Sequence, residues 1–205
     1  MREVEARIAV VLLAAGGSTR LGRPKQLLPY NGSTLLRHAV ETALAAKLGP
    51  VVLVLGAQAE ACREAVAGLP VAIVVNAQWD AGMGGSIAAG VAALTRDPGQ
   101  TPDAAILMLC DQPGVTPEHL NRLAAAFRAG DAPIVASAYG GSAGVPALFS
   151  RRLFPDLMAL NPAQGAKALI ARHGERVARV DFPEGALDID TPADYERLRQ
   201  HREPA

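Results

Sequence analysis

Short apolar runs alternate with segments of helical periodicity along most of the chain. Five runs lack polar alternation, as strands covered on both faces do: Ile8–Leu13, Val51–Leu55, Val71–Val75, Ala104–Leu109 and Ile134–Ala138. Apolar residues recur at helical spacing between them, in Leu35–Lys47, Glu60–Ala67, Ser86–Leu94 and Glu118–Arg128. This β-α alternation predicts a three-layer α/β/α fold with a mostly parallel, twisted sheet and right-handed crossovers.

Helix boundaries carry their usual signals. Ser33 and Thr116 stand at predicted N-cap positions, and Pro117 occupies a first helical position. Gly49 and Gly130 fall just past predicted helix ends, where glycine is favoured. These residues support the helical segments inferred from periodicity.

The pattern changes after Tyr139. We expect a flexible loop, a brief strand, two helices, two further strands and a last helix, namely Gly140–Gly144, Ala147–Phe149, Ser150–Leu160, Gly165–His173, Val177–Phe182, Leu187–Ile189 and a helix beginning at Pro192. No repeat, low-complexity tract or linker interrupts the sequence. We therefore expect residues 1–205 to form a single domain.

Composition narrows the classes of function. The chain has 205 residues, no formal net charge and only 4% aromatic residues, so the core must be mostly Ala, Val and Leu. The absent basic excess argues against a nucleic-acid surface. Cys62 and Cys110 match no zinc or redox spacing, which favours reduced thiols in the cytoplasm. The N-terminus is too charged for a signal peptide, and its apolar run is too short for a membrane span.

The loop after the first strand has the character of a phosphate site. Glycines let a backbone approach a ligand closely, and successive N–H groups form an anion-binding concavity. Arg20 and Lys25 add positive charge there. The residues expected to surround a polyphosphate are Leu13, Ala14, Ala15, Gly16, Gly17, Ser18, Arg20 and Lys25. The Walker pattern of P-loop proteins is absent. The dinucleotide-binding pattern Gly-x-Gly-x-x-Gly is absent too, and this disfavours a dehydrogenase.

Two acidic segments are candidates for a metal site. Asp111 follows the run 104–109 directly, so it is either a Mg²⁺ ligand or an Asp that turns the chain before Pro113. On a strand, Asp188 and Asp190 would point to one side with Ile189 facing the core, and a shared cation would neutralise them. Which of the two touches the ion stays open.

Two further segments complete the pattern. Asp194 is assigned to a capping box with Thr191 at the start of the last helix. In residues 76–86 a glycine-rich backbone could read the edge of a planar base, with Asn76, Gly82, Met83 and Ser86 as candidates. Ser86 is alternatively a helix N-cap, and Trp79 either shields the site or anchors the loop.

Taken together, these segments resemble the cytidylyltransferase branch of the molybdenum-cofactor nucleotidyltransferases. The resemblance runs in order through residues 12–25, Asn76–Ser86, Cys110–Pro113, Gly144–Phe149 and Asp188–Asp194. It implies a nucleotidyltransferase fold, with 1–138 as the nucleotide-binding part and 139–205 as the acceptor side. It also implies Arg20, Lys25 and Asp111 as catalytic residues, and Mg²⁺ (or Mn²⁺) held by Asp111, Asp188 and Asp190.

The implied reaction is transfer of CMP from CTP to the phosphate of molybdopterin, with release of pyrophosphate. Transient handover of the product to a molybdoenzyme or its chaperone follows from the same resemblance. Ala163 and Val145 stand where relatives often have polar residues, which puts the acceptor in doubt. GTP as donor, a sugar phosphate or other small phosphate as acceptor, and a non-catalytic nucleotide or cofactor carrier remain the alternatives.

Overall fold

Residues 5–200 are described by a computed structural model, in which seven strands form one sheet in the order β5-β4-β1-β6-β8-β7-β9. The strands are β1 Ile8–Ala14, β4 Val51–Leu55, β5 Ala72–Val75, β6 Ala104–Leu109, β7 Ile134–Tyr139, β8 Ser142–Ser150 and β9 Val177–Asp181. Only β8 runs antiparallel to its neighbours within this sheet. A small hairpin, β2 Pro29–Tyr30 and β3 Ser33–Thr34, lies outside it.

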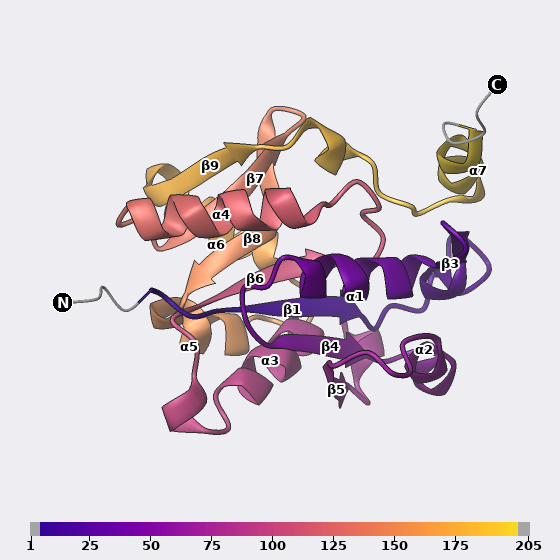
Figure 1. The fold of residues 1–205 in the computed structure, drawn as a ribbon, viewed down its shortest axis with the longest axis horizontal. Helices are drawn as coiled ribbons and strands as arrows, with labels where there is room; N and C mark the ends of the chain where they lie inside the picture. Colours follow the sequence, from indigo (N-terminus) through magenta and orange to yellow (C-terminus); the bar gives the residue numbers. More distant parts are fainter. Residues whose placement is uncertain (1–4, 201–205) are drawn as a thin grey trace.

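Helices cover both faces of the sheet, which confirms the predicted three-layer α/β/α class (Figure 1). One face packs against α1 Leu35–Ala45, α2 Ala59–Ala65 and α4 Pro117–Ala129. The other packs against α3 Met83–Leu94, α5 Phe154–Met158 and α6 Ala166–His173. No helix within residues 5–200 is long and apolar enough to cross a bilayer.

Strand β1 forms the centre of the core. All seven of its residues are buried, and alternate side chains enter the two hydrophobic clusters on opposite faces. Leu12 packs on one face and Val11 on the other. Each such buried side chain contributes about 1.5–3 kcal/mol relative to exposure, so an unbroken apolar run is what this position requires. Cys62 and Cys110 are buried and form no disulfide.

One predicted N-cap and one predicted helix start are wrong. Helix α1 begins at Leu35 as expected, but Thr34 rather than Ser33 caps it, because Thr34 directly precedes the helix and its Oγ1 accepts from Arg37 N at 3.1 Å. Helix α3 begins at Met83, so Ser86 is not its N-cap but a buried residue of the first turns.

The segment after Tyr139 differs most from expectation. Gly140 and Gly141, with φ of 55° and 74°, make a tight turn, so the predicted loop is short and β8 already starts at Ser142. Because β8 continues to Ser150, a 3-10 turn Arg151–Leu153 and the short α5 replace the predicted helix 150–160. Residues 187–189 form no strand: beyond the sheet edge, Ile189 N donates to Asp111 O instead.

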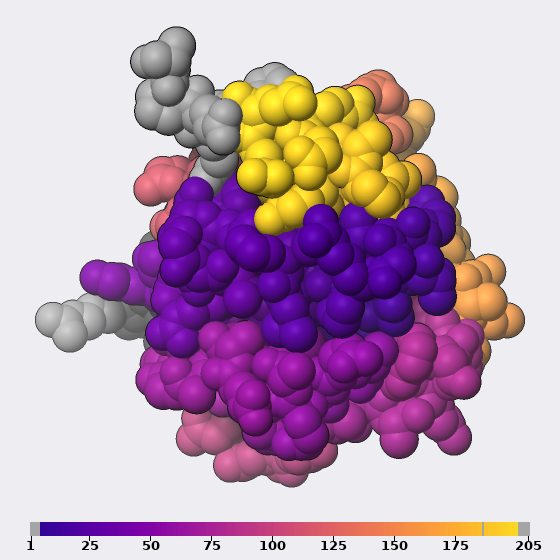
Figure 2. All heavy atoms as spheres, turned by 90° about the vertical axis from the view of Figure 1, so that its right-hand side faces the viewer, coloured from indigo at the N-terminus to yellow at the C-terminus, as the bar shows by residue number. Residues whose placement is uncertain are grey.

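The C-terminal helix α7, Pro192–Gln200, returns to the beginning of the chain. Figure 2 shows its yellow atoms lying against indigo N-terminal residues. Tyr195 donates a hydrogen bond to Pro29 O at 2.9 Å, and Arg23 lies 5.0 Å above the Tyr195 ring centroid. A small hydrophobic cluster that includes Ile189 and Leu198 packs α7 against the N-terminal residues. Residues 1–4, which belong to the charged N-terminus, and 201–205 lie outside the described range.

Gly90 sets the distance between α3 and the sheet, and this gives a test of the packing. A Cβ at Gly90 would lie 2.4 Å from Val11 Cγ1, whereas one at Gly85 in the same helix would meet nothing nearer than 3.5 Å. Alanine is the better helix former at both positions, so the clash at Gly90 is what distinguishes the two variants. We expect Gly90→Ala to be less stable than the control Gly85→Ala by about 1–3 kcal/mol. Equal midpoints in urea denaturation would contradict this packing.

Candidate active site

A cavity of about 320 Å³ lies at the carboxyl ends of β1 and β6, the edge of a parallel sheet at which ligands bind. Its wall is formed by Leu13, Ala14, Ala15, Gly16, Gly17, Thr19, Lys25, Gln26, Trp79, Asp80, Gly82, Met83, Ser86, Leu109, Cys110 and Asp111. Most of the residues predicted from sequence are among them. Ser18 and Asn76 contact two of the wall residues, Lys25 and Ser86, through hydrogen bonds. Arg20, Asp188 and Asp190 are not part of the wall; Arg20 pairs with Asp190, which in turn pairs with Lys25.

The glycine-rich loop is shaped by short-range hydrogen bonds. Ser18 has a positive φ of 54°, and its Oγ accepts from Lys25 N at 3.0 Å. The buried Gln26 donates through Nε2 to Ala14 O at 3.0 Å and to Gly16 O at 2.7 Å. Sequence reasoning missed Gln26, because nothing in the pattern indicates that a polar residue beside Lys25 is buried under the loop.

Lys25 lies between two carboxylates that are far apart in sequence. Its Nζ is 2.5 Å from Asp111 Oδ2 and 2.8 Å from Asp190 Oδ1. Burial alone would lower the pKa of Lys25, but the charges and hydrogen bonds of Asp111 and Asp190 hold it above its ordinary value. Arg20 reaches Asp190 Oδ2 at 2.8 Å from a largely exposed position. The hydrogen bond from Lys25 outweighs partial burial and lowers the pKa of Asp190.

The donor set fits a divalent cation at Asp111 and Asp190. Asp111 Oδ1 is buried and accepts no hydrogen bond from the described residues, and Lys25 supplies the positive charge between the two carboxylates. Asp188 lies in the same segment, where partial burial and the charge of Asp111 raise its pKa. Within residues 5–200 no group of three His, Cys, Asp or Glu side chains is close enough to hold a metal, so the three-carboxylate set stays a prediction.

The loop predicted to contact a base packs against a distant segment. Gly82 has φ of 124°, and a Cβ there would lie 2.3 Å from Pro162 O. Gly84 N donates to the same carbonyl at 2.9 Å. Ser86 Oγ accepts from Asn76 Nδ2 at 3.1 Å and so fixes the loop from its other end. The segment carrying Ala163 is therefore in contact with the base loop as well as belonging to the expected acceptor side.

Trp79 closes the cavity against the first loop. A Cβ on Gly17 would lie 2.9 Å from the indole Cζ3, and one on Gly56 would lie 2.5 Å from Trp79 Cβ. These two glycines leave the space that the indole occupies. The role as loop anchor, one of the two alternatives from sequence, is thus observed, and the indole also lines the cavity.

The expected acceptor strand is held by hydrogen bonds from the buried Gln112 and the half-buried Tyr139. Val145 O accepts from Gln112 Nε2 at 3.2 Å and from Tyr139 Oη at 2.9 Å. Pro146 O accepts from Ser137 Oγ at 2.5 Å, which in turn lies 2.7 Å from His119 Nε2. These bonds tie β8 to β7 and to the end of β6, next to Asp111.

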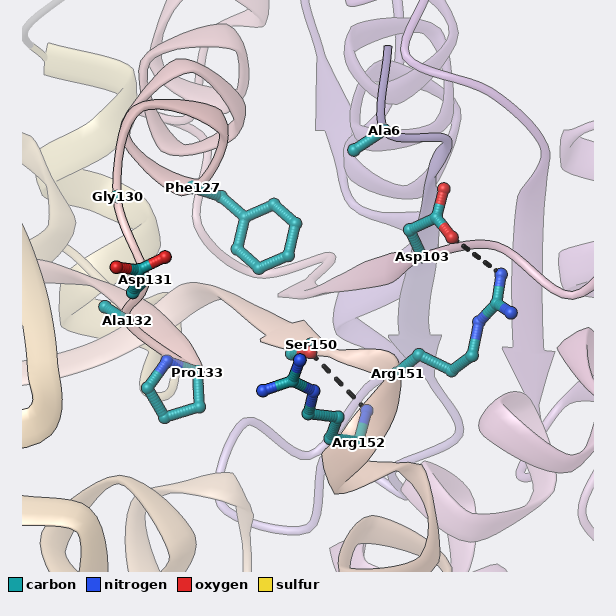
Figure 3. Close-up of a pocket in the computed structure, with 10 residues that line it drawn as sticks. All are labelled: Ala6, Asp103, Phe127, Gly130, Asp131, Ala132, Pro133, Ser150, Arg151 and Arg152. Atoms are coloured by element: carbon teal, nitrogen blue, oxygen red, sulfur yellow. Dashed lines mark hydrogen bonds and ion pairs between the residues drawn. The ribbon is translucent and has the colours of Figure 1, made fainter. Parts of the chain in front are cut away.

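A larger hollow, of about 550 Å³, lies at the opposite edge of the sheet (Figure 3). Arg151 faces Asp103 there at 2.8 Å, and the backbone N of Arg152 donates to Ser150 Oγ. Phe127 and Pro133 provide its apolar wall. None of the site residues predicted from sequence lines it, and two of its charged side chains, Arg151 and Asp103, are already paired with each other.

Sheet, loop and carboxylates together define the class of nucleotidyltransferases, and the sequence comparison agrees. Residues 10–177 match the family described as the MobA-like NTP transferase domain. The chain belongs to this family. The resemblance found from its motifs is thereby confirmed at the level of the family and of the nucleotidyltransferase fold.

Similar proteins extend this result. Nicotine blue oxidoreductase of Paenarthrobacter nicotinovorans is 46% identical over 121 residues, 58% of this chain and 57% of that protein, so the match spans little more than half of that relative. Purine catabolism protein PucB of Bacillus subtilis is 30% identical over 203 residues, 93% and 95% of the two chains. The crystal structure of Rv0371c from Mycobacterium tuberculosis has a TM-score of 0.81 and 34% identity, covering 96% and 100%. A second structure of Rv0371c is a complex with manganese.

His119 makes fold stability depend on pH. Its Nδ1 accepts from Arg122, so Nε2 carries the proton that Ser137 Oγ accepts. Burial, helped by the Arg122 charge and opposed by Glu184, lowers the pKa of His119 from 6.5 to about 4. Between about pH 6.5 and pH 4, His119 is therefore protonated in the unfolded chain but neutral in the folded chain. The free energy of unfolding falls as the pH falls through this range.

We expect His119 to account for a loss of about 2 kcal/mol between about pH 7.5 and pH 5. In His119→Gln, which keeps a donor for Ser137 and does not titrate, this share of the loss should vanish. Urea denaturation of both proteins at the two pH values measures the difference. Identical losses in the two proteins would show that His119 does not titrate as described.

Proposed function

We propose that the protein transfers CMP from CTP to the phosphate of molybdopterin and releases pyrophosphate, with Mg²⁺ as the metal and Mn²⁺ as a substitute. The observation that carries the proposal is the cavity at the carboxyl edge of the sheet: the glycine-rich loop, Lys25 and Asp111 form its wall, and Lys25 also pairs with a second carboxylate, Asp190. The presence of Lys25 beside the carboxylates of Asp111 and Asp190 argues for catalysis, because a protein that only carries a nucleotide has no need of metal-binding residues.

The chemistry asks the protein to position two partners and to offset developing charge. An oxygen of the acceptor phosphate forms a bond to the α-phosphorus as the bond to the pyrophosphate oxygen breaks. Lys25, Arg20 and the loop amides bind the triphosphate, and Asp111 and Asp190, with Asp188 nearby, are the residues that would hold the metal. A metal there would add positive charge beside the phosphates. Burial raises the pKa of Cys110, the residue before Asp111, well above its ordinary value. This thiol therefore stays protonated and does not act as a nucleophile.

The choice of substrates rests on the resemblance in residues 76–86 and 144–149. The cavity of about 320 Å³ accommodates a nucleotide in part, with the acceptor expected beside Val145. Ala163 and Val145 favour keeping a sugar phosphate or another small phosphate as the second candidate acceptor. GTP stays the second candidate donor, because only the resemblance of residues 82–86 favours CTP. One relative is named an oxidoreductase, but the chain lacks the dinucleotide-binding glycine pattern.

The remaining parts of the proposal concern the setting of the reaction. We propose that residues 1–205 act as one domain in the cytoplasm, with 1–138 holding the nucleotide and 139–205 the acceptor. The product would pass to a molybdoenzyme or its chaperone. No nucleic-acid or membrane partner belongs to this proposal.

A competition assay tests donor and acceptor together. The protein is incubated with Mg²⁺, molybdenum-loaded molybdopterin and equal amounts of CTP, GTP, ATP and UTP, and the products are identified by mass. We expect a cytosine dinucleotide and pyrophosphate. Trp79, the only tryptophan, lines the cavity and reports binding by its fluorescence. Binding of a triphosphate without any dinucleotide would remove the molybdopterin assignment and direct the assay to sugar phosphates.

Removing either charged partner at the cavity should remove turnover. We expect Lys25→Ala and Asp111→Ala each to lower kcat by about 100-fold or more, because each contributes to charge stabilisation at the phosphates. Lys47→Ala, an exposed lysine past α1, serves as the control and should keep activity. Circular dichroism checks the fold of each variant. Near wild-type turnover in either site variant would refute the assignment.

A further inference from the structure

Two carboxylates beside Lys25, those of Asp111 and Asp190, are already neutralised by positive side chains. Lys25 and Asp111 are 16% and 13% exposed, and Lys25 Nζ also contacts Asp190. Arg20, 72% exposed, contacts the other oxygen of Asp190. The two negative charges are thus matched by two positive charges before any ligand enters. Within the described residues, Asp111 Oδ1 alone of these four carboxylate oxygens is left without a hydrogen bond.

This arrangement has a consequence for the order in which ligands bind. Building on the proposed function, we propose that Lys25 holds the cation position between Asp111 and Asp190 in the nucleotide-free protein, so that a divalent metal binds tightly only together with the nucleotide. A divalent ion beside Asp111 would lie within a few ångströms of the Lys25 ammonium. Like charges at that separation repel strongly in a site of reduced dielectric constant.

The nucleotide supplies the alternative partner for Lys25. Its triphosphate carries several negative charges and is expected in the glycine-rich loop, and Lys25 lines the same cavity. The backbone of Lys25 is anchored, since its N donates to Ser18 Oγ and its O accepts from Leu28 N at 3.2 Å. The four-carbon side chain can therefore move from the carboxylates to the phosphates while the loop stays in place.

Moving Lys25 frees Asp111 and Asp190 for the metal at the moment when phosphate oxygens also become ligands. Each ligand then raises the affinity for the other by the same factor, as linkage requires. Arg20 does not have to move when the metal binds, because its side chain is largely exposed and contacts Oδ2 of Asp190 rather than the Oδ1 that Lys25 occupies. Lys25 thereby acts as a positioning residue for the metal in addition to its contact with phosphate.

Binding of Mn²⁺ alone, followed by the electron paramagnetic resonance signal of the free ion, tests this role. Without nucleotide, Lys25→Met should bind Mn²⁺ at least about tenfold more tightly than the wild type. Lys47→Met removes the same charge from the exposed segment after α1 and should match the wild type. Equal Mn²⁺ affinity of the wild type and Lys25→Met would overturn the proposal.

A second measurement uses the wild type and remains decisive if Lys25→Met does not fold. Lys25, Lys47 and Lys167 are the lysines of the chain, so ¹³C labelling at Cε gives few signals, assigned with Lys47→Met and Lys167→Met. Mg²⁺ alone should leave the Lys25 signal in place, whereas Mg²⁺ with CTP, in the absence of acceptor, should shift it. A shift with Mg²⁺ alone would overturn the proposal.

Turnover of the wild type separates this inference from the proposed function. Product formation together with tight nucleotide-free Mn²⁺ binding would keep the function and overturn the role of Lys25. A tighter Mn²⁺ site in Lys25→Met, together with a wild type that binds nucleotide but forms no cytosine dinucleotide, would support the role of Lys25 and overturn the assigned substrates.

Discussion

The ion pairs of Lys25 join three segments that the sequence keeps far apart. Asp111 follows β6, Asp190 precedes α7 and Lys25 ends the first loop, so their meeting depends on the whole sheet being in register. Partly buried charges lose hydration, and an apolar replacement is often as stable as such a pair. The cluster is therefore poorly explained as a stabilising device. It is better explained as a site held ready for charged ligands.

Much of the fold follows from local pattern. The unbroken apolar run of β1 and the directly following glycines predicted a buried strand and a phosphate-binding loop after it, and Asp111 likewise follows the apolar run 104–109 directly. In the structure this loop and Asp111 line the same cavity. What failed depends on contacts that no local pattern contains. Residues 187–189 look like a strand but bond to the backbone of residue 111, and Gln26 is buried only because the first loop folds over it.

The division into a nucleotide part and an acceptor part is less sharp in space than in sequence. Gly84 N donates to Pro162 O, and Gly82 leaves room for the same carbonyl. A change at Ala163 therefore bears on the base loop as much as on the acceptor. Motif position alone does not assign the effect of Ala163 to one substrate, because the adjacent Pro162 carbonyl contacts the loop predicted to bind the base.

Asp194 links helix capping to the site itself. Its Oδ2 accepts from Thr191 N at 2.8 Å and from Asp190 N at 3.2 Å, while Thr191 Oγ1 accepts from Asp194 N, as the capping box predicts. Hydrogen bonds from Thr191 and Arg197 lower the pKa of Asp194 to about 2, so the capping carboxylate stays ionised in mildly acidic solution as well as at neutral pH. The residue that starts α7 thus also fixes the backbone of Asp190. Asp194 therefore serves the helix and the site at once. By fixing the backbone of Asp190 it positions the carboxylate that Lys25 bridges to Asp111.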